Sequence, residues 1–438
     1  MANSAKEQTR QLQRALYRAA KQKATRRFHA LYDKVYRWDV LEQAWQHVKA
    51  NGGAPGVDGE TLQDIEQQGV DTVLRELQTQ LRERQYRPWP VRRTYIPKPG
   101  KAEKRGLGIP RIRDRIVQTA AKLVLEPIFE ADFVDCSYGF RPKRSAQDAE
   151  ERIRQLANQG RDYVVDADIR AYFDTIDQEK LMGMVAQRVS DRRMLKLIRI
   201  WLKAGVMEEG ELRKATTGTP QGGCISPLLA NLYLHGLDLQ WQQQHQRLGA
   251  IVRYADDLVI LCFTAQAAEA ALQQLKGLLA TLGLQVHPEK TRIRCLRKGQ
   301  EGFDFLGFHH RKRESWRRKG SYYLHRWPSR KAKQAICRKI KTIVGAPSQR
   351  RQPVHEVIRT LNPVLRGWGT YFCKGNSSRQ LNQVDDYVAQ QMRLYLSKKH
   401  QRRGRNWKRY SDTFLYQKLG LYRLRGTVRW YTSAKARG

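Results

Sequence analysis

The alternation of apolar and polar positions predicts a half-buried strand near the middle of the chain, over residues 163–168. Val165 and Ala167 fall on one face of such a strand, while Asp166 and Asp168 fall on the other, because successive side chains of a strand point to opposite faces. The strand therefore ends with a carboxylate, Asp168, on its polar side.

A second pattern predicts a tight β-hairpin about ninety residues later. Two β-prone runs, 251–252 and 258–262, flank Ala255 and Asp256, which form a plausible turn. A turn at this point places Asp256 and its neighbour Asp257 outside the sheet. The hairpin is thus expected to carry two adjacent carboxylates at its crest.

Longer apolar periods predict helices. Ser226 followed by Pro227 is typical of a cap and a first-turn proline, and the leucines after them form one apolar stripe: Leu228, Leu229, Leu232 and Leu237. Two further apolar faces follow beyond residue 330 and predict packed helices, with Pro363 bending or ending the second one: Ile336, Ile340 and Ile343; then Val354, Val357, Ile358, Leu361 and Leu365.

The carboxylates suggest metal chemistry. Two unneutralised acids side by side repel each other, so a fold that keeps them usually supplies a cation, and hard oxygen ligands suit Mg²⁺. With Asp168 they could hold two ions about 3.5–4 Å apart, which activates an attacking 3′ hydroxyl and stabilises leaving pyrophosphate. A solvated Asp-Asp turn is the alternative, and three rival acids lie near Asp168: Asp166, Asp174 and Asp177.

Composition points to a polyanionic partner. The chain has 82 Lys and Arg against 42 Asp and Glu, a net charge of +40, so binding to nucleic acid should weaken steeply with salt. Two segments mix cations with aromatic residues, 311–319 and 398–410, which suits single strands or folded RNA; a solvated basic loop or tail is the alternative. The residues expected to bind nucleic acid are Arg311, Lys312, Arg313, Arg317, Arg318, Arg402, Arg403 and Arg405.

The cysteines and the apolar runs of the sequence indicate the cellular compartment of the protein. The six cysteines are scattered without a C-x-x-C pair, which indicates neither a zinc site nor a disulfide framework. No apolar run is long enough to cross a membrane, and the N-terminus has no signal-peptide core. We expect a cytoplasmic protein without membrane attachment, associated with the nucleoid when it acts on DNA.

The ordered motifs resemble those of bacterial group II intron-encoded reverse transcriptases, which are also maturases. The polymerase motifs are Asp168-Ile169, Thr-Pro-Gln-Gly-Gly at 219–223 and Tyr-Ala-Asp-Asp at 254–257. Flanking runs extend the likeness over roughly residues 40–375: 53–59, 95–100, 107–110, 138–142, 283–291, 303–308 and 361–372. The family often adds a C-terminal HNH endonuclease domain, and the resemblance is to the form that lacks it.

The resemblance implies an α+β, right-hand polymerase of fingers and palm, with an α-helical thumb or maturase domain and a small basic C-terminal appendage. The expected domains are a basic helical N-terminal arm at 1–50, fingers at 51–160, palm at 161–310, thumb at 311–378 and a basic DNA-binding region at 379–438.

The resemblance also assigns roles to individual residues. Asp168, Asp256 and Asp257 would be the catalytic acids and, with Ile169, the ligands of two Mg²⁺; a supporting role is the alternative for Asp257. Tyr172 or Phe173, with Tyr172 favoured, would lie under the incoming sugar and exclude a 2′ hydroxyl; core packing is the alternative for Tyr172. The remaining residues expected to contact the nucleotide are Lys98, Arg105, Gln221 and Lys290; for Lys98, Arg105 and Lys290, solvated surface positions are the alternative.

The implied function is an RNA-directed DNA polymerase that binds its group II intron RNA, assists splicing and copies the RNA into DNA during intron mobility. Its partners would be that RNA, a DNA target and primer, and deoxynucleoside triphosphates. The alternatives are a related polymerase recruited to host repair or defence, a splicing factor without polymerase activity, and a generic RNA-packaging protein.

Overall fold

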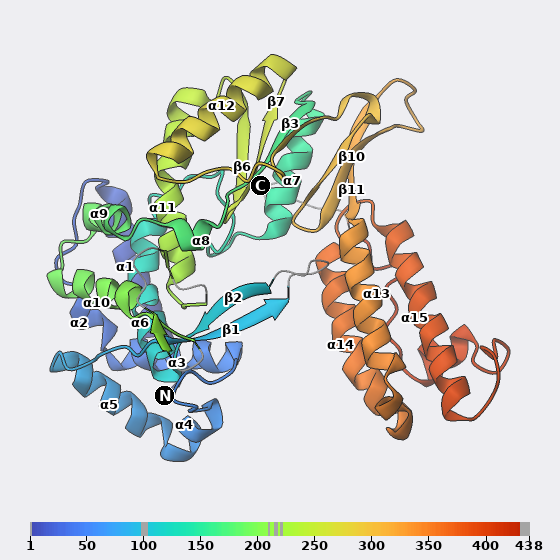
Figure 1. Cartoon of the computed structure of the whole chain (residues 1–438), viewed down its shortest axis with the longest axis horizontal. Helices are drawn as coiled ribbons and strands as arrows, with labels where there is room; N and C mark the ends of the chain where they lie inside the picture. The colour runs from blue at the N-terminus through green and yellow to red at the C-terminus, as the bar shows by residue number, and fades with distance from the viewer. Residues whose placement is uncertain (1, 98–103, 209–210, 214–217, 220–221, 430–438) are drawn as a thin grey trace. The chain divides into compact units, whose positions relative to one another are not determined.

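The computed structural model describes residues 2–97, 104–208, 211–213, 218–219 and 222–429. The chain forms two compact units (Figure 1). The N-terminal unit comprises Met1–Ser145, Ala167–Val259 and Glu269–Arg292, and the C-terminal unit comprises Ala146–Asp166, Ile260–Ala268 and Ile293–Gly438. These units do not follow the expected domain limits, because the segment expected to form the fingers, 51–160, divides after Ser145.

Helices dominate the start of the N-terminal unit: α1 (Ala2–Gln22), α2 (Tyr32–Val35), α3 (Trp38–Asn51), α4 (Leu62–Gln68), α5 (Val70–Arg82) and α6 (Ile112–Glu130). Helix α1 is tied to its neighbours: Thr9 Oγ1 donates to Asp39 of α3 at 3.0 Å, and Gln13 Nε2 donates to the Leu123 carbonyl of α6 at 3.1 Å. The first fifty residues are therefore mostly helical, as expected, and α1 packs against other helices of this unit.

A four-stranded sheet with the order β2-β1-β4-β5 accompanies these helices. Its strands are β1 (Val91–Pro97), β2 (Lys104–Ile109), β4 (Val206–Glu208) and β5 (Glu211–Arg213). β1 and β2 pair antiparallel, with Ile96 opposite Arg105, and β1 continues in parallel pairing with β4.

A second four-stranded sheet has the order β6-β7-β3-β8. Its strands are β3 (Tyr163–Asp168), β6 (Ala250–Tyr254), β7 (Asp257–Cys262) and β8 (Arg292–Cys295), and its neighbouring helices along the chain are α7 (Ala146–Asn158), α8 (Tyr172–Thr175), α9 (Gln178–Arg188), α10 (Arg192–Lys203), α11 (Ser226–Gln240) and α12 (Ala265–Thr281). The predicted strand, hairpin and helix start at Ser226 are confirmed. The leucine stripe of α11 is buried, as its period predicts.

A three-stranded antiparallel sheet in the C-terminal unit includes the first four residues of the basic segment 311–319, and residues 315–321 connect two of its strands. Its order is β11-β10-β9, with β9 at Gly302–Phe305, β10 at Phe308–Glu314 and β11 at Tyr322–Pro328. Arg311 and Arg313 therefore lie in a strand, with His325 opposite Arg311 and Tyr323 opposite Arg313.

Three helices lie side by side in the same unit: α13 (Arg330–Gly345), α14 (Val354–Phe372) and α15 (Ser378–Lys399) (Figure 1). Helix α14 runs through Pro363 to Phe372, so of the two expected effects of this proline, a bend or an end of the helix, the end does not occur. One apolar cluster joins Ile340 of α13, Leu361 of α14 and Val388 of α15 to Leu424. Leu424, from the segment expected to form the basic C-terminal region, thus belongs to the same core as the three helices.

Candidate active site

Asp256 and Asp257 lie where the β6–β7 hairpin reverses. Ala255 adopts a left-handed conformation with φ of 57°, which makes the turn tight. Asp256 is half-buried and Asp257, the first residue of β7, is exposed. Asp256 therefore lies in the turn as expected, whereas Asp257, expected outside the sheet, is the first residue of β7 and only its side chain is exposed.

A buried arginine holds the backbone of that turn. Arg253 is fully buried and forms an ion pair with Asp238 of α11, its Nε lying 2.8 Å from Asp238 Oδ1. Its Nη1 donates to the Ala255 carbonyl at 2.9 Å and to Asn231 Oδ1 at 3.2 Å, and its Nη2 donates to Ser137 Oγ at 2.8 Å. The guanidinium thus connects α11 and the Ser137 segment to the carbonyl that immediately precedes Asp256.

The glycine of the Tyr-Gly-Phe-Arg-Pro run approaches the same turn closely. A Cβ atom on Gly139 would lie 2.5 Å from the Ala255 nitrogen, closer than packed atoms tolerate. Asn231 Nδ2 donates to the Gly139 carbonyl at 2.7 Å, and the Tyr138 nitrogen donates to the Arg253 carbonyl at 2.9 Å. Glycine at this position lets the two backbones meet.

The third acid is fixed by a different segment. The Asp168 carbonyl accepts from the His287 nitrogen at 2.7 Å, and the Arg170 nitrogen donates to the Gln285 carbonyl at 2.9 Å. The same segment brings Lys290, whose Nζ lies 2.7 Å from Asp168 Oδ2. Asp168 ends β3, which neighbours β7 in the sheet, so the strands that carry the three acids are adjacent.

The rings after Asp168 correct one expectation. Tyr172 is 2% exposed and its hydroxyl donates to the Ala230 carbonyl, whereas Phe173 is half-buried. Burial raises the pKa of the Tyr172 phenol well above its ordinary value; Arg253 opposes that shift and Asp256 adds to it. Tyr172 is therefore a core residue, and Phe173 is the less buried of the two rings.

One rival acid has a structural role. Asp177 caps α9, with its Oδ1 accepting from the Glu179 and Lys180 nitrogens at 2.9 Å each. Asp166 is half-buried and Asp174 is exposed. Asp168 remains the acid whose main chain and carboxylate are both fixed by the Lys290 segment.

Thr219 and Gly222, two described residues of the glycine-rich loop, contact neighbouring segments. The Thr219 nitrogen donates to the Phe173 carbonyl at 2.8 Å. A Cβ atom on Gly222, which has φ of +115°, would collide with the Gly108 carbonyl of β2. Gln221 and Lys98 lie outside the described residues, and Arg105 lies in β2.

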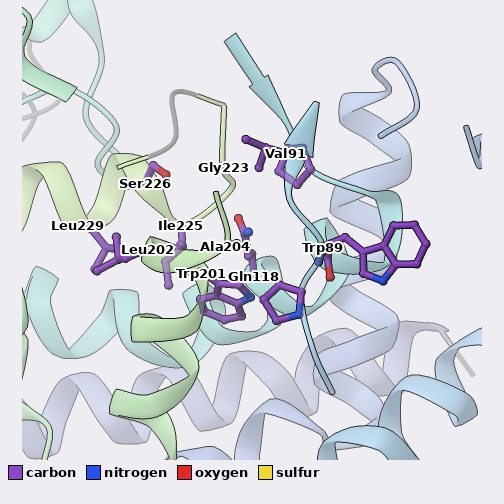
Figure 2. A pocket seen from close by; sticks show the side chains of 13 residues that line it. Trp89, Val91, Gln118, Trp201, Leu202, Ala204, Gly223, Ile225, Ser226 and Leu229 are labelled. Carbon is purple, nitrogen blue, oxygen red and sulfur yellow. Dashed lines mark hydrogen bonds between the residues drawn. The ribbon is translucent and has the colours of Figure 1, made fainter. Parts of the chain in front are cut away.

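A small cavity of about 10 Å³ lies under the same loop (Figure 2). Figure 2 shows Gly223 above the side chains of Gln118, from α6, and of Trp201 and Leu202, from α10. Gln118 Oε1 accepts from the Cys224 nitrogen at 2.8 Å. The loop therefore rests on a closely packed floor.

The basic residues expected to bind nucleic acid differ in exposure. The expectation that Lys312 binds nucleic acid is corrected, because its side chain is 7% exposed and its ammonium pairs with Asp162. The others are exposed: Arg311, Arg313, Arg317, Arg318, Arg402, Arg403 and Arg405. Arg317 lies over the ring of Trp316, which is 86% exposed.

The fit of a metal ion rests on donor chemistry. Among the described residues, no three His, Cys, Asp or Glu side chains already lie close enough together to hold a cation. The carboxylates on adjacent strands are nevertheless the hard oxygen donors that Mg²⁺ prefers. The residues present thus suit a cation.

Sequence reasoning missed the residues that position the turn, Arg253, Asp238, Asn231 and Gly139. One signal was present: Arg253 interrupts the apolar run of the hairpin directly before the acid motif. A charged residue at an inward strand position requires a buried partner, which the sequence alone does not identify.

Comparisons with known proteins agree with this geometry. The family described as "Reverse transcriptase (RNA-dependent DNA polymerase)" matches residues 96–310, and "Group II intron, maturase-specific domain" matches residues 333–411. These matches identify a reverse transcriptase, an RNA-directed DNA polymerase by class.

Similar proteins show to which family of reverse transcriptases the chain belongs. Protein YkfC of Escherichia coli is 35% identical over 68% of this chain and 87% of its own length. The group II intron-encoded protein LtrA of Lactococcus lactis is 38% identical over 48% of this chain, but the match spans only 35% of LtrA. A chain of the Cas6-RT-Cas1–Cas2 complex matches 58% of this chain and 42% of that chain, at 27% identity and a TM-score of 0.36. The chain belongs to the family of group II intron-encoded reverse transcriptases with a maturase domain.

No helix in the described part of the chain is both long and apolar enough to cross a membrane.

Proposed function

We propose that the protein extends a DNA primer on an RNA template, with Asp168, Asp256 and Asp257 as its catalytic acids. The observation that carries the proposal is the placement of Asp168 and the Asp256 turn on the neighbouring strands β3 and β7, each fixed by its own hydrogen bonds. Two Mg²⁺ held by these carboxylates and by the Ile169 carbonyl would activate the 3′ hydroxyl and stabilise the leaving pyrophosphate.

The nucleotide would lie against Phe173, whose ring excludes a 2′ hydroxyl. Lys290 supplies an ammonium next to Asp168 and suits the triphosphate or the departing pyrophosphate. Lys98, Arg105 and Gln221 are the further residues proposed to contact the nucleotide.

The maturase domain at 333–411 and the net charge of +40 support a folded RNA as the second partner. We infer that this RNA is the group II intron that encodes the protein, that the protein assists its splicing, and that it copies the RNA after integration into a DNA target. The exposed arginines at 402, 403 and 405 suit the phosphates of either nucleic acid, and a nucleoid location follows from action on DNA.

The test is extension of a DNA primer on an RNA template with deoxynucleotides and Mg²⁺. We expect extension by the intact protein and at least about a hundredfold loss in Asp256→Asn, because that substitution removes a metal-binding charge without changing side-chain size. Asp71→Asn is the matched control, since Asp71 is exposed in the first turn of α5.

Equal extension by Asp256→Asn and Asp71→Asn would reject the assigned acids. A protein that binds RNA in a salt-sensitive manner but never extends a primer would support the splicing-factor alternative. Preferential binding of the RNA that flanks its own gene, compared with an unrelated folded RNA, would separate an intron role from recruitment to host repair or defence.

A further inference from the structure

A polar cavity of about 280 Å³ lies within the C-terminal unit, away from the acids of the hairpin in sequence. The strands β10 and β11 and the first turns of α13 and α15 line it, and none of its lining residues is acidic. Four cationic side chains border it: Arg313, Arg330, Lys333 and Arg379. A concave site with four cations and no compensating carboxylate is suited to an anion.

Two of these cations are held in place by neighbours. The Arg313 guanidinium lies over the Trp327 ring, 4.9 Å from its centroid, and Lys333 Nζ donates to Gln383 Oε1 at 2.9 Å. Burial and the charge of Arg313 lower the pKa of His325, so the arginines and the lysine carry the positive charge at neutral pH. The cavity is therefore partly organised before a ligand arrives.

Helix geometry adds to the attraction for anions. Arg330 is the first residue of α13 and Arg379 the second of α15, helices of 16 and 22 residues. The N-terminal turn of a helix presents free N–H groups and the positive end of its dipole. Both helices thus turn their positive ends toward the cavity lining.

One lining group, the side-chain oxygen of Gln380, can accept a hydrogen bond from a ligand. Gln380 Oε1 is buried and has no hydrogen-bond partner among the described residues. A phosphodiester cannot satisfy it, because its oxygens only accept. The ribose 2′ hydroxyl beside a phosphodiester can donate, and it is the group by which a protein distinguishes RNA from DNA.

We propose that this cavity binds one phosphodiester of a single-stranded RNA, with Arg330, Lys333 and Arg379 on the phosphate and Gln380 accepting from the adjacent 2′ hydroxyl. Tyr323, which is 44% exposed on β11, offers a ring to a base of the same strand. The site deepens the proposed function, on which it rests, by giving the RNA a contact of its own outside the catalytic acids.

The test compares the affinities of a short fluorescent single-stranded RNA and a DNA of the same sequence, without deoxynucleotides. Arg379→Gln is expected to weaken both by about tenfold and to reduce the salt slope of log K by about 0.7, since one phosphate contact is lost. Gln380→Leu is expected to weaken RNA binding several-fold and to leave the affinity for DNA unchanged. Arg379→Lys should recover part of the loss because it restores the charge.

Arg82→Gln is the matched control, because it removes the same charge from an exposed position on α5. Thermal unfolding of each variant verifies that the fold is retained. Arg379→Gln indistinguishable from Arg82→Gln would overturn the phosphate site, and Gln380→Leu weakening RNA and DNA equally would overturn the 2′ hydroxyl contact. Primer extension by the wild type, together with the titrations repeated in Asp256→Asn, separates the two proposals. If RNA binding depends on Arg379 but the wild type extends no primer, the polymerase proposal alone is rejected. If the wild type extends a primer but RNA binding does not depend on Arg379, the cavity proposal alone is rejected.

Discussion

Lys290 and Asp168 are 122 residues apart in the sequence, yet Lys290 Nζ lies 2.7 Å from Asp168 Oδ2. The hydrogen bond from the His287 nitrogen to the Asp168 carbonyl brings the two segments together three residues before the lysine. The ammonium therefore neutralises a carboxylate that we assign to a metal ion, and it competes with that ion for the same oxygen.

Lys290→Met should lower the Mg²⁺ concentration that gives half-maximal primer extension. The pair is partly exposed, with side chains 46% and 24% accessible. Exposed pairs contribute at most about 1 kcal/mol, so the shift should not exceed about fivefold. A Mg²⁺ titration at saturating deoxynucleotide measures it, with Lys298→Met as the control; an unchanged midpoint would show that the ammonium does not compete with the metal.

Phe173→Ala should relax sugar selection, whereas Tyr172→Phe should not. Phe173 is the less buried ring of the two, and Tyr172 only donates a hydrogen bond inside the core. Single-nucleotide incorporation with ribo- and deoxyribonucleotides should show at least about a tenfold gain in relative ribonucleotide use for Phe173→Ala.

Tyr172→Phe removes one buried hydrogen bond and should cost about 1 kcal/mol of the free energy of unfolding, with selection unchanged. The reverse outcome, altered selection in Tyr172→Phe alone, would restore Tyr172 as the ring under the sugar.

The sequence predicted elements whose cause is local. The hairpin at 250–262 and the strand at 163–168 follow from alternation and turn chemistry within a few residues, and the stripe of α11 follows from the helical period. Which of the two rings is buried, Tyr172 or Phe173, does not follow from such local patterns. Ala171 adopts φ of 46° directly before the buried Tyr172 and the half-buried Phe173, a backbone detail that no pattern reveals.

Contacts distant in sequence were equally hidden. Lys312 was expected to bind nucleic acid, but its partner Asp162 lies 150 residues earlier. The alternation of β10, with Lys312 buried and Arg311 and Arg313 exposed, could have been predicted only if 308–314 had been interpreted as a strand. The partners of Arg253 likewise come from α11 and from Ser137, 116 residues away.

Asp238→Asn should destabilise the protein strongly, because it leaves the Arg253 guanidinium buried without its partner charge. Breaking a buried pair from one side typically costs about 3–5 kcal/mol. Arg253→Met combined with Asp238→Leu should recover much of that stability, since apolar replacements of both partners remove the uncompensated charge.

Primer extension by this double variant should nevertheless stay low, because the bond from Arg253 Nη1 to the Ala255 carbonyl is lost. Urea unfolding and extension, measured on the same preparations, separate the two effects. Recovery of both stability and extension would mean that Arg253 does not position the acid turn.

His235 should make the folded state less stable in mild acid. Burial lowers its pKa from 6.5 to about 4; Asp238 opposes the shift, while Arg253 and Arg141 add to it. Between these values the unfolded chain binds a proton that the folded chain rejects, so the free energy of unfolding falls as the pH falls from about 6.5 to about 4. The loss attributable to His235 should reach up to about 3 kcal/mol and vanish above neutral pH.

The measurement is the difference in the free energy of unfolding between wild type and His235→Leu across this pH range, since other groups that titrate there cancel in the difference. His235 packs edge-on against Phe133, with ring centroids 5.3 Å apart, and leucine keeps that contact apolar. His355→Leu is the control because it removes an imidazole that is 76% exposed. A flat curve for His235→Leu would mean that the His235 imidazole remains protonated, or is hydrated, in the folded protein.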